Sequence, residues 1–304
     1  MDYDAIATHF LTPAVTPQAA PVVPDTPARA LRDALEPIAT IGWWSRSAAE
    51  RMGALGHDFF DGYVWGRAAA LGADVAPAVV VAAFGAFEHT LLTTVLELGR
   101  SISTRDAILA ARADGASAGL QAATSGVAPA TVAAFADRLL PSLAALDATG
   151  RPLFAALRDL DMPHDAYGRA WRASELVREH RGDGHIAARV AAGLDVVTMN
   201  VLTECWLGYR AGEYTSTRGY STDRVEVASA GLRRRGWMTS VGDLTMAGRE
   251  ARDQIEAATD RSQDELIAAL GMQHADIVRT ASVLGAAILA ARAAPADARK
   301  RAAG

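Results

Sequence analysis

Apolar residues along the chain recur mostly at helical intervals. From about Ala28, residues Leu31, Leu35 and Ile38 fall on one stripe, and another helix is expected to begin near Ser47. Spacings of three and four residues place side chains on one face of an α-helix, whereas the side chains of a strand alternate every second residue. The pattern therefore predicts a mainly α-helical protein.

The order of elements in the second half of the chain is typical of a winged helix. The expected elements are a helix over 196–209, a Gly- and Thr-bearing segment over 211–219, a helix capped by Ser221 or Thr222 and ended by Gly236, two very short strands over 237–239 and 244–245, and a helix over 246–259. We interpret the short strands and the turn between them as a small β-wing.

Several short motifs occur twice in the same order. Leu-Arg-Asp at 31–33 returns at 157–159, Asp-Gly at 61–62 returns at 183–184, and Ala-Ser-Ala-Gly-Leu at 116–120 returns at 228–232. Each match is weak alone in an alanine-rich chain, but their common order predicts an internal duplication. We expect two tandem winged-helix-like repeats over 28–150 and 151–271, related by a pseudo-two-fold axis and facing each other across a cleft.

The two ends of the chain differ from the repeats. Residues 1–27 carry five prolines that repeatedly block helix, so a flexible Pro/Ala-rich tail is predicted. Residues 272–304 predict one Ala-rich helix that ends near Pro295, followed by a basic tail of Arg299, Lys300 and Arg301. Its apolar stripe consists of Ile277, Ala281, Leu284 and Ile288. We expect this helix either to clamp the two repeats together or to form a homodimer.

Composition narrows the class of protein. Half of the residues are apolar but only 6% are aromatic, which favours close-packed helices over a β-sandwich. A formal net charge of -5 argues against a protein that coats nucleic acid nonspecifically, although a local basic patch can still bind DNA. The single cysteine, Cys205, excludes internal disulfides and is expected to be buried. Without a signal-like start or a long apolar run, we expect a cytoplasmic protein that has no membrane contact.

Two sets of motifs resemble known families. Residues 232–237 (Leu-Arg-Arg-Arg-Gly-Trp) and 244–249 (Leu-Thr-Met-Ala-Gly-Arg) resemble the recognition-helix end, wing and following helix of MarR-type regulators. Over about 28–271, the chain is similar to an actinobacterial family of helix-turn-helix proteins. The matching positions are Gly62-Tyr63, Gly66 to Ala69, Trp171, Arg178 to His185, Leu244-Thr245 and Gly248-Arg249. This resemblance implies a helix-turn-helix fold and a role in regulation.

DNA binding would follow if the MarR-like interpretation holds, because the helix from Thr222 would then enter the major groove. The candidate DNA-binding residues are Arg224, Arg233, Arg234 and Arg235, with Arg218 and Arg249 nearby. Asp223 and Glu226 lie on the same helix and would be repelled by phosphate, and the expected wing has no Lys or Arg. The alternative is a solvated helix end whose arginines compensate the helix dipole.

The segment from Arg178 to His185 has the highest density of ionisable side chains in the chain. Gly182 and Gly184 interrupt it, so we expect a helix end or a turn there. A metal site is disfavoured, because the two histidines are five residues apart and no cysteine lies near in the sequence.

Three other interpretations of this segment stay open. A histidine beside a carboxylate offers general acid/base chemistry, for which the candidates are His185, His180 and Asp183. Its arginines and histidines can instead bind an anionic ligand. The third interpretation is a network of charges that satisfy one another and pin the interface between the repeats.

The equivalent segment of the first repeat, from His57 to Trp65, is far more aromatic. A polar wall facing an aromatic wall suits a ligand with a flat apolar body and an acidic group. The candidate ligand-binding residues are Trp65, Arg67, Arg178, Arg181 and His185. No metal is predicted, and the sequence identifies no cofactor.

Together these patterns favour a small-molecule-binding winged-helix protein that acts as a ligand-responsive transcriptional regulator. The alternatives are an enzyme of small-molecule metabolism with an acid/base site in the cleft between the repeats, and an interaction scaffold.

Overall fold

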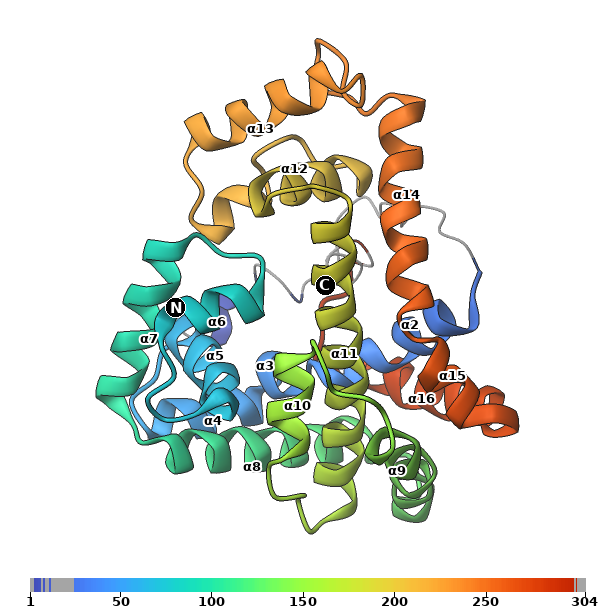
Figure 1. Ribbon diagram of the computed structural model, residues 1–304. Helices are drawn as coiled ribbons and strands as arrows, with labels where there is room; N and C mark the ends of the chain where they lie inside the picture. The colour runs from blue at the N-terminus through green and yellow to red at the C-terminus, as the bar shows by residue number, and fades with distance from the viewer. Residues whose placement is uncertain (1–2, 7, 9–10, 12–24, 298, 300–304) are drawn as a thin grey trace.

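The structure is a computed structural model that describes residues 3–6, 8, 11, 25–297 and 299. The described residues are mainly α-helical, as predicted. A helical body forms the lower part of Figure 1, and a smaller unit projects above it. Two long helices, α11 (Ala166–Ala191) and α14 (Met246–Arg261), connect the body with the projecting unit, which also contains α12 (Val196–Trp206) and α13 (Thr222–Arg234).

The body is assembled from helices of both ends of the chain. The helices of its first half are α2 (Pro27–Ala39), α3 (Ile41–Trp44), α4 (Arg46–Ala54), α5 (Phe59–Ala68), α6 (Pro77–Phe84), α7 (His89–Ile102) and α8 (Arg105–Ala123). Those that follow are α9 (Pro129–Ala144), α10 (Pro152–Arg158), α15 (Asp264–Leu270) and α16 (His274–Ala290). A short helix, α1 (Tyr3–Ile6), precedes them, and 3₁₀ turns lie at Ala69–Leu71, Thr215–Arg218 and Gly271–Gln273.

Most of the longer helices begin at a polar residue whose side chain accepts a hydrogen bond from a backbone N–H of the first turn. Such a cap satisfies a donor that has no partner within the helix. These capping residues are Thr26, Ser45, Glu88, Thr104, Asp165, Asp195, Ser221 and Thr245. The expected cap at Ser221 is therefore confirmed.

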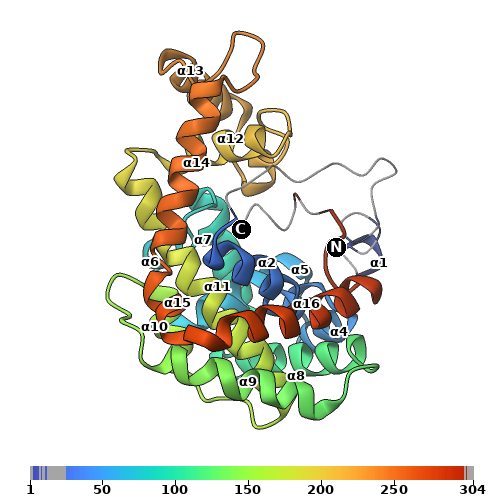
Figure 2. The same cartoon turned by 90° about the vertical axis from the view of Figure 1, so that its right-hand side faces the viewer.

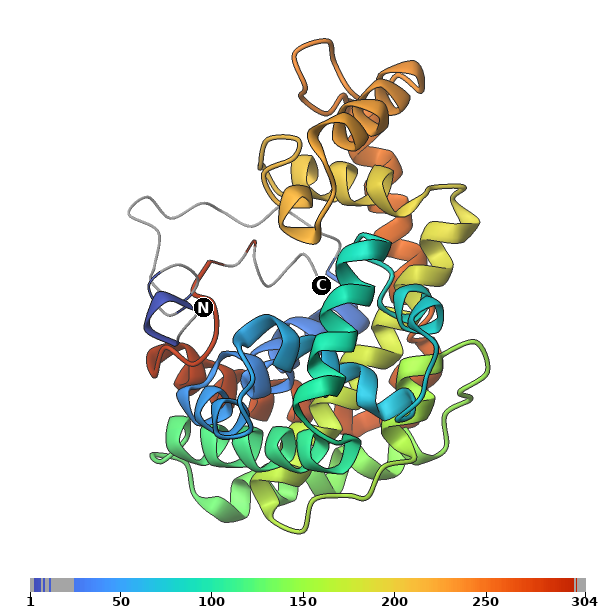
Figure 3. The same ribbon diagram turned by 90° about the vertical axis from the view of Figure 1, so that its left-hand side faces the viewer.

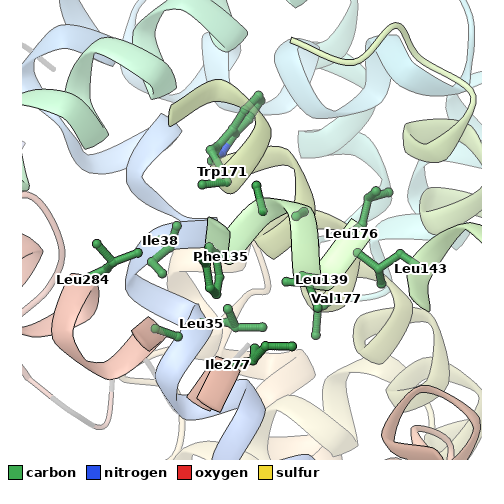
Figure 4. Close-up of a cluster of buried hydrophobic side chains, with 14 of the residues drawn as sticks. Leu35, Ile38, Phe135, Leu139, Leu143, Trp171, Leu176, Val177, Ile277 and Leu284 are labelled. Carbon is green, nitrogen blue, oxygen red and sulfur yellow. The ribbon is translucent and has the colours of Figure 1, made fainter. Parts of the chain in front are cut away.

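The largest apolar core lies around the lower half of α11. Trp171 and Val177 of α11 pack there with Leu35 of α2, Phe135 of α9 and Ile277 of α16 (Figure 4). This cluster extends from Leu31 to Ala294 and so combines side chains of both predicted repeats. Figure 2 shows α2 and α16 side by side, and their contact closes the body.

Two smaller apolar clusters complete the interior. One joins α4, α5, α6 and α7 around Trp65 and Leu92, on the side of the body below α13. The other lies inside the projecting unit, where Leu202 of α12, Leu232 of α13 and Ile255 of α14 pack together. Each cluster is small, so the attachment of the projecting unit depends strongly on α11 and α14.

The predicted β-wing is not formed as a pair of strands. Within the described part of the chain, 237–245 makes a tight turn with a single antiparallel bridge between Met238 and Leu244. A hydrogen bond from Thr245 N to Trp237 O (3.0 Å) closes the turn.

The structure does not support the predicted tandem winged-helix arrangement. The identical segments 116–120 and 228–232 lie on helices of different length and surroundings. Helix α8 has 19 residues and packs on α4 and α11, whereas α13 has 13 residues and packs on α12. Their glycines also differ, since a Cβ at Gly119 would collide with Ser45 whereas a Cβ at Gly231 would not collide with any atom. The repeat boundaries at 150–151 stay a prediction.

The expectations for the chain ends have mixed outcomes. The helical stripe of Ile277, Ala281, Leu284 and Ile288 is confirmed and fully buried. Helix α16 ends at Ala290, five residues before Pro295, and Arg299 pairs with Asp297. Most of the predicted tail over 1–27, as well as Lys300 and Arg301, lies outside the described residues.

We expect Gly115→Ala to destabilise the protein by about 1–3 kcal/mol, because overpacking forces the backbone apart. Helices α4 and α8 cross so closely that a Cβ at Gly115 would lie 2.7 Å from Cα of Ala48. Urea unfolding followed by circular dichroism measures the change. Gly53→Ala on α4 is the matched control, since a Cβ there meets nothing within 4 Å. The control should be neutral or stabilise by up to about 1 kcal/mol, and equal behaviour of the two variants would contradict the packing argument.

Candidate functional site

The segment from Arg178 to His185 lies within the continuous helix α11, so the expected helix end or turn is wrong. One of its two glycines, Gly184, serves helix packing instead. A Cβ at Gly184 would collide with Oγ of Ser262, the residue that ends α14. The absence of a side chain at 184 therefore allows α11 to approach the junction of α14 and α15.

Glu179 is fully buried on α11 and pairs with two arginines. It accepts hydrogen bonds from Nε (3.0 Å) and Nη2 (2.5 Å) of Arg67 and from Nη1 of Arg178 (2.9 Å). Although burial opposes ionisation, the positive charges of Arg67 and Arg178 lower the pKa of Glu179 to about 2, from 4.5. This pairing stabilises the fold above pH 4.5 and is lost as the pH falls toward 2.

Arg181 lies two residues further along α11 and faces α14. Its Nη2 contacts Glu256 and donates to Oδ1 of Asp260 (2.9 Å). Glu256 also accepts from Nη1 of Arg29 (2.8 Å) and from Nη1 of Arg252 (2.6 Å). These three arginines and two carboxylates join α2, α11 and α14 in one buried network.

The two histidines of the segment have neutral hydrogen-bond partners on the other side of the interface. Nδ1 of His180 lies 2.9 Å from Oε1 of Gln263, and Nδ1 of His185 lies 3.0 Å from Oγ1 of Thr259. Burial lowers the pKa of His180 to about 4 and that of His185 to about 3. Both rings are therefore neutral at pH 7, and neither is hydrogen-bonded to a carboxylate.

Asp183 contacts the start of α10 rather than a histidine. Its Oδ2 accepts a hydrogen bond from N of Phe154 (3.0 Å), while Oδ1 is buried without a hydrogen-bond partner among the described residues. Burial raises the pKa of Asp183 to about 7. The structure thus does not bring together the acid/base pairs His185 with Asp183 or His180 with Glu179.

The two segments predicted to line a cleft meet through an ion pair. Arg67 of α5 reaches Glu179 of α11, and its guanidinium also lies 4.3 Å from the ring centroid of Phe84. Trp65 is buried within the body and donates from Nε1 to the carbonyl oxygen of Ser103 (3.0 Å). The two segments are therefore in contact, as expected, but the contact consists of an ion pair and packed side chains.

The sequence analysis did not identify several carboxylates that take part in these buried ion pairs. Glu175 is fully buried and lies between Arg112 of α8 and Arg172 of α11. Glu256 and Asp260 of α14 were also not singled out. The available signal was carboxylates at four-residue intervals, 175 with 179 and 256 with 260.

The projecting unit has a helix-turn-helix order of α12, a connection over 207–221, and α13 (Figure 3). Buried Glu204 of α12 organises the connection by accepting hydrogen bonds from N of Gly212 (2.6 Å), Tyr214 (2.7 Å) and Thr215 (2.9 Å). Oγ1 of Thr215 adds a fourth bond (2.8 Å). This carboxylate, which sequence analysis did not identify, fixes the approach to α13.

The four arginines proposed to bind DNA differ in their contacts. Arg224 and Arg234 are exposed on α13, and no side-chain hydrogen bond or ion pair holds them within the described chain. Arg233 pairs with Glu226 (2.7 Å) on the same helix. Arg235 lies over the ring of Trp237 (5.1 Å) and donates to the carbonyl oxygen of Gly193 (3.3 Å). Arg224 and Arg234 are thus the two best able to contact a partner.

Among the described residues, no group of three or more His, Cys, Asp or Glu side chains is arranged to hold a metal ion. In the same part of the chain, no single helix has the length and apolarity to cross a membrane, and two bent helix pairs reach them only when each pair is combined. Cys205 is buried as predicted, and burial raises the pKa of its thiol to about 12.

Comparison with known proteins gives one match. A model described as a helix-turn-helix family matches residues 28–295, which is most of the chain. No curated protein and no solved structure matches.

Replacing Glu179 by alanine should destabilise the protein by about 3–5 kcal/mol, because Arg67 and Arg178 would stay buried without their counter-charge. Urea unfolding at pH 7 measures the loss. Asp276→Ala, which removes an exposed pair with Arg279, is the control and should change the stability little. If both variants lose the same small amount of unfolding free energy, the network does not hold α11 in place.

Asp183→Asn should become increasingly more stable than the wild type as the pH rises from 4 to 7. In the unfolded chain this carboxyl ionises near its ordinary pKa of 3.8, whereas the folded protein keeps the proton until about pH 7. A shift of about three units corresponds to roughly 4 kcal/mol, which is the upper limit of the expected difference. Unfolding free energies at unit pH intervals from 4 to 8 test this, and a difference that is constant with pH would disprove it.

Proposed function

The chain belongs to this helix-turn-helix family, and on that premise we propose that it is a transcriptional regulator that binds duplex DNA with α13. The observation that carries the proposal is the pair Arg224 and Arg234, exposed on the outer side of a helix at the far end of the molecule. Val225, Ala228 and Leu232 of α13 face the interior of the projecting unit. The outer side of α13 is thus free to enter a major groove.

The short turn after α13 adds apolar side chains to the same end of the molecule. Val241 is 83% exposed and Met246 is 86% exposed, and both adjoin the bridge between Met238 and Leu244. Such side chains suit contact with sugar or with thymine methyl groups rather than with phosphate. We therefore assign electrostatic contacts to Arg224, Arg234 and the exposed Arg249.

We further propose that the protein binds DNA as a dimer, in the manner of MarR-type regulators. A dimer would place two copies of α13 in successive grooves and offset the weak basic character of a single copy. The apolar stripe of α16 packs inside the body, so a homodimer through this helix would use its outer side, where Val283 is 52% exposed. We also propose, as the sequence suggests, that a small molecule controls DNA binding.

The enzyme alternative lacks a supporting arrangement. His180 and His185 are bonded to Gln263 and Thr259, and Asp183 is bonded to the backbone of α10. We therefore propose that the motif from Arg178 to His185 holds the body and the projecting unit together.

We expect Arg224→Ala and Arg234→Ala each to weaken binding to DNA fragments selected from the host genome. Arg224 lies in the first turn of α13, where base edges are read, so its loss should also relax the selected sequence. Arg234, near the end of the helix, should act on phosphate, and its loss should reduce the salt dependence by about one unit of slope. Fluorescence anisotropy over a range of salt concentrations separates the two effects.

The matched control for both variants is Arg279→Ala, an exposed arginine on α16 in the body. It should leave affinity and salt dependence unchanged. Failure to select any DNA sequence, or equal losses in all three variants, would contradict DNA binding through α13.

A further inference from the structure

We propose that a cavity between α3, α4, α5 and α8 binds an aromatic carboxylate and that its occupancy controls α13. This inference rests on the proposed DNA-binding function. The cavity is not lined by the motif from Arg178 to His185, although the guanidinium of Arg178 lies 4.7 Å from the ring centroid of Trp43 in the cavity wall. The argument has three parts: the shape of the cavity, the charge at its inner end, and its contacts with the projecting unit.

The cavity has a volume of about 430 Å³, which is in the range of small-molecule sites. Trp43, Met52, Phe59 and Tyr63 are among its lining residues and provide a largely apolar wall. The Trp43 and Tyr63 rings meet edge to face at 5.1 Å, so they form a rigid corner. Flat apolar molecules fit such a surface.

The inner end of the cavity carries an incompletely paired charge. Arg112 of α8 lines the cavity and is 1% exposed. Its Nη2 contacts Glu175, but Nε and Nη1 have no hydrogen-bond partner among the described residues. Glu175 is also within 3.5 Å of Arg172, so two buried arginines share one carboxylate. A ligand anion would supply the missing acceptor and counter-charge.

The outer end of the cavity has groups of both signs. Arg46, Glu50 and Asp58 line it there, and Arg46 pairs with Asp4 (2.9 Å). The excess positive charge is therefore at the inner end only. This polarity favours a ligand whose carboxylate enters first, with its ring between Trp43, Phe59 and Tyr63.

A short segment between α6 and α7 connects this cavity with the projecting unit. Tyr63 of the cavity wall contacts the rings of Phe84 (6.4 Å between centroids) and Phe87 (6.2 Å). The guanidinium of Arg218, in the connection before α13, lies 4.9 Å from the Phe87 ring centroid. The chain therefore passes from the cavity wall to the helix-turn-helix connection through two aromatic rings.

Hydrogen bonds fasten the same segment to the connection. N of Glu88 donates to the carbonyl oxygen of Arg218 (2.8 Å), and the hydroxyl of Tyr220 donates to the carbonyl oxygen of Phe87 (3.0 Å). Tyr220 directly precedes Ser221, the N-cap of α13. A movement of Tyr63 on ligand entry would thus displace the start of α13.

The binding step is tested on the full chain without DNA. Isothermal titration with benzoate, indole-3-acetate and 2-naphthoate should show binding by at least one of them, while benzyl alcohol and benzylamine should not bind. Arg112→Met should weaken the bound carboxylate roughly ten- to hundredfold, because charge-assisted hydrogen bonds are lost. The control variant is Arg279→Met, which removes an exposed arginine.

A second variant protects the test against misfolding of Arg112→Met. Gly53 lines the cavity, and a Cβ there meets nothing within 4 Å, so Gly53→Leu should fold and fill the entrance. It should abolish binding while circular dichroism stays unchanged. If no carboxylate binds up to millimolar concentration, or if both cavity variants bind as well as the wild type, the site is disproved.

The coupling step is tested separately on selected DNA. A bound carboxylate should change the DNA affinity of the wild type at least fivefold. Phe87→Leu should keep carboxylate binding but lose this change, since the ring that contacts Arg218 is absent. Ligand binding without any change in DNA affinity would disprove the control of α13. If the ligand-free wild type binds no DNA at all, the proposed DNA-binding function is disproved instead.

Discussion

The need to pair buried charges along α11 is the constraint on which the rest of the structure depends. This helix of 26 residues runs through the body to the projecting unit, about 39 Å at 1.5 Å per residue. It carries Glu175, Glu179 and Arg181 in its buried part. An unpaired buried charge costs several kcal/mol, so each must find a partner on another helix. Those partners come from α5, α8 and α14, and they fix where these helices lie around α11.

This pairing also explains how the projecting unit is held. Arg181 joins α11 to Glu256 and Asp260 of α14, and Arg29 joins α2 to the same Glu256. The projecting unit is therefore attached to the body through α11 and α14, and buried ion pairs join these two helices to each other. The other attachment of α13 to the body is the contact between the connection over 207–221 and the segment between α6 and α7, which hydrogen bonds from Glu88 N and Tyr220 hydroxyl make.

The sequence predicts helices better than it predicts what surrounds them. Apolar stripes identified α2 and α16, and a capping serine identified the start of α13, because these signals depend on neighbouring residues. The position of Arg178 to His185 inside a helix was not predictable from its glycines, since Gly184 is required by Ser262, 78 residues later in the chain. For the same reason, no local pattern assigned Glu179 to Arg67 or Glu204 to the connection before α13.

The same constraint separates the charged motif from the proposed ligand cavity. Glu179 is held by two arginines and Arg181 by two carboxylates, so a ligand would have to break strong buried ion pairs to bind them. Arg112 differs because its carboxylate is shared with Arg172, and two of its nitrogens have no acceptor. An anion bound at Arg112 would supply acceptors for these two nitrogens without removing the pairs that hold the fold. A ligand can therefore bind beside α11 and reach α13 while the body stays intact.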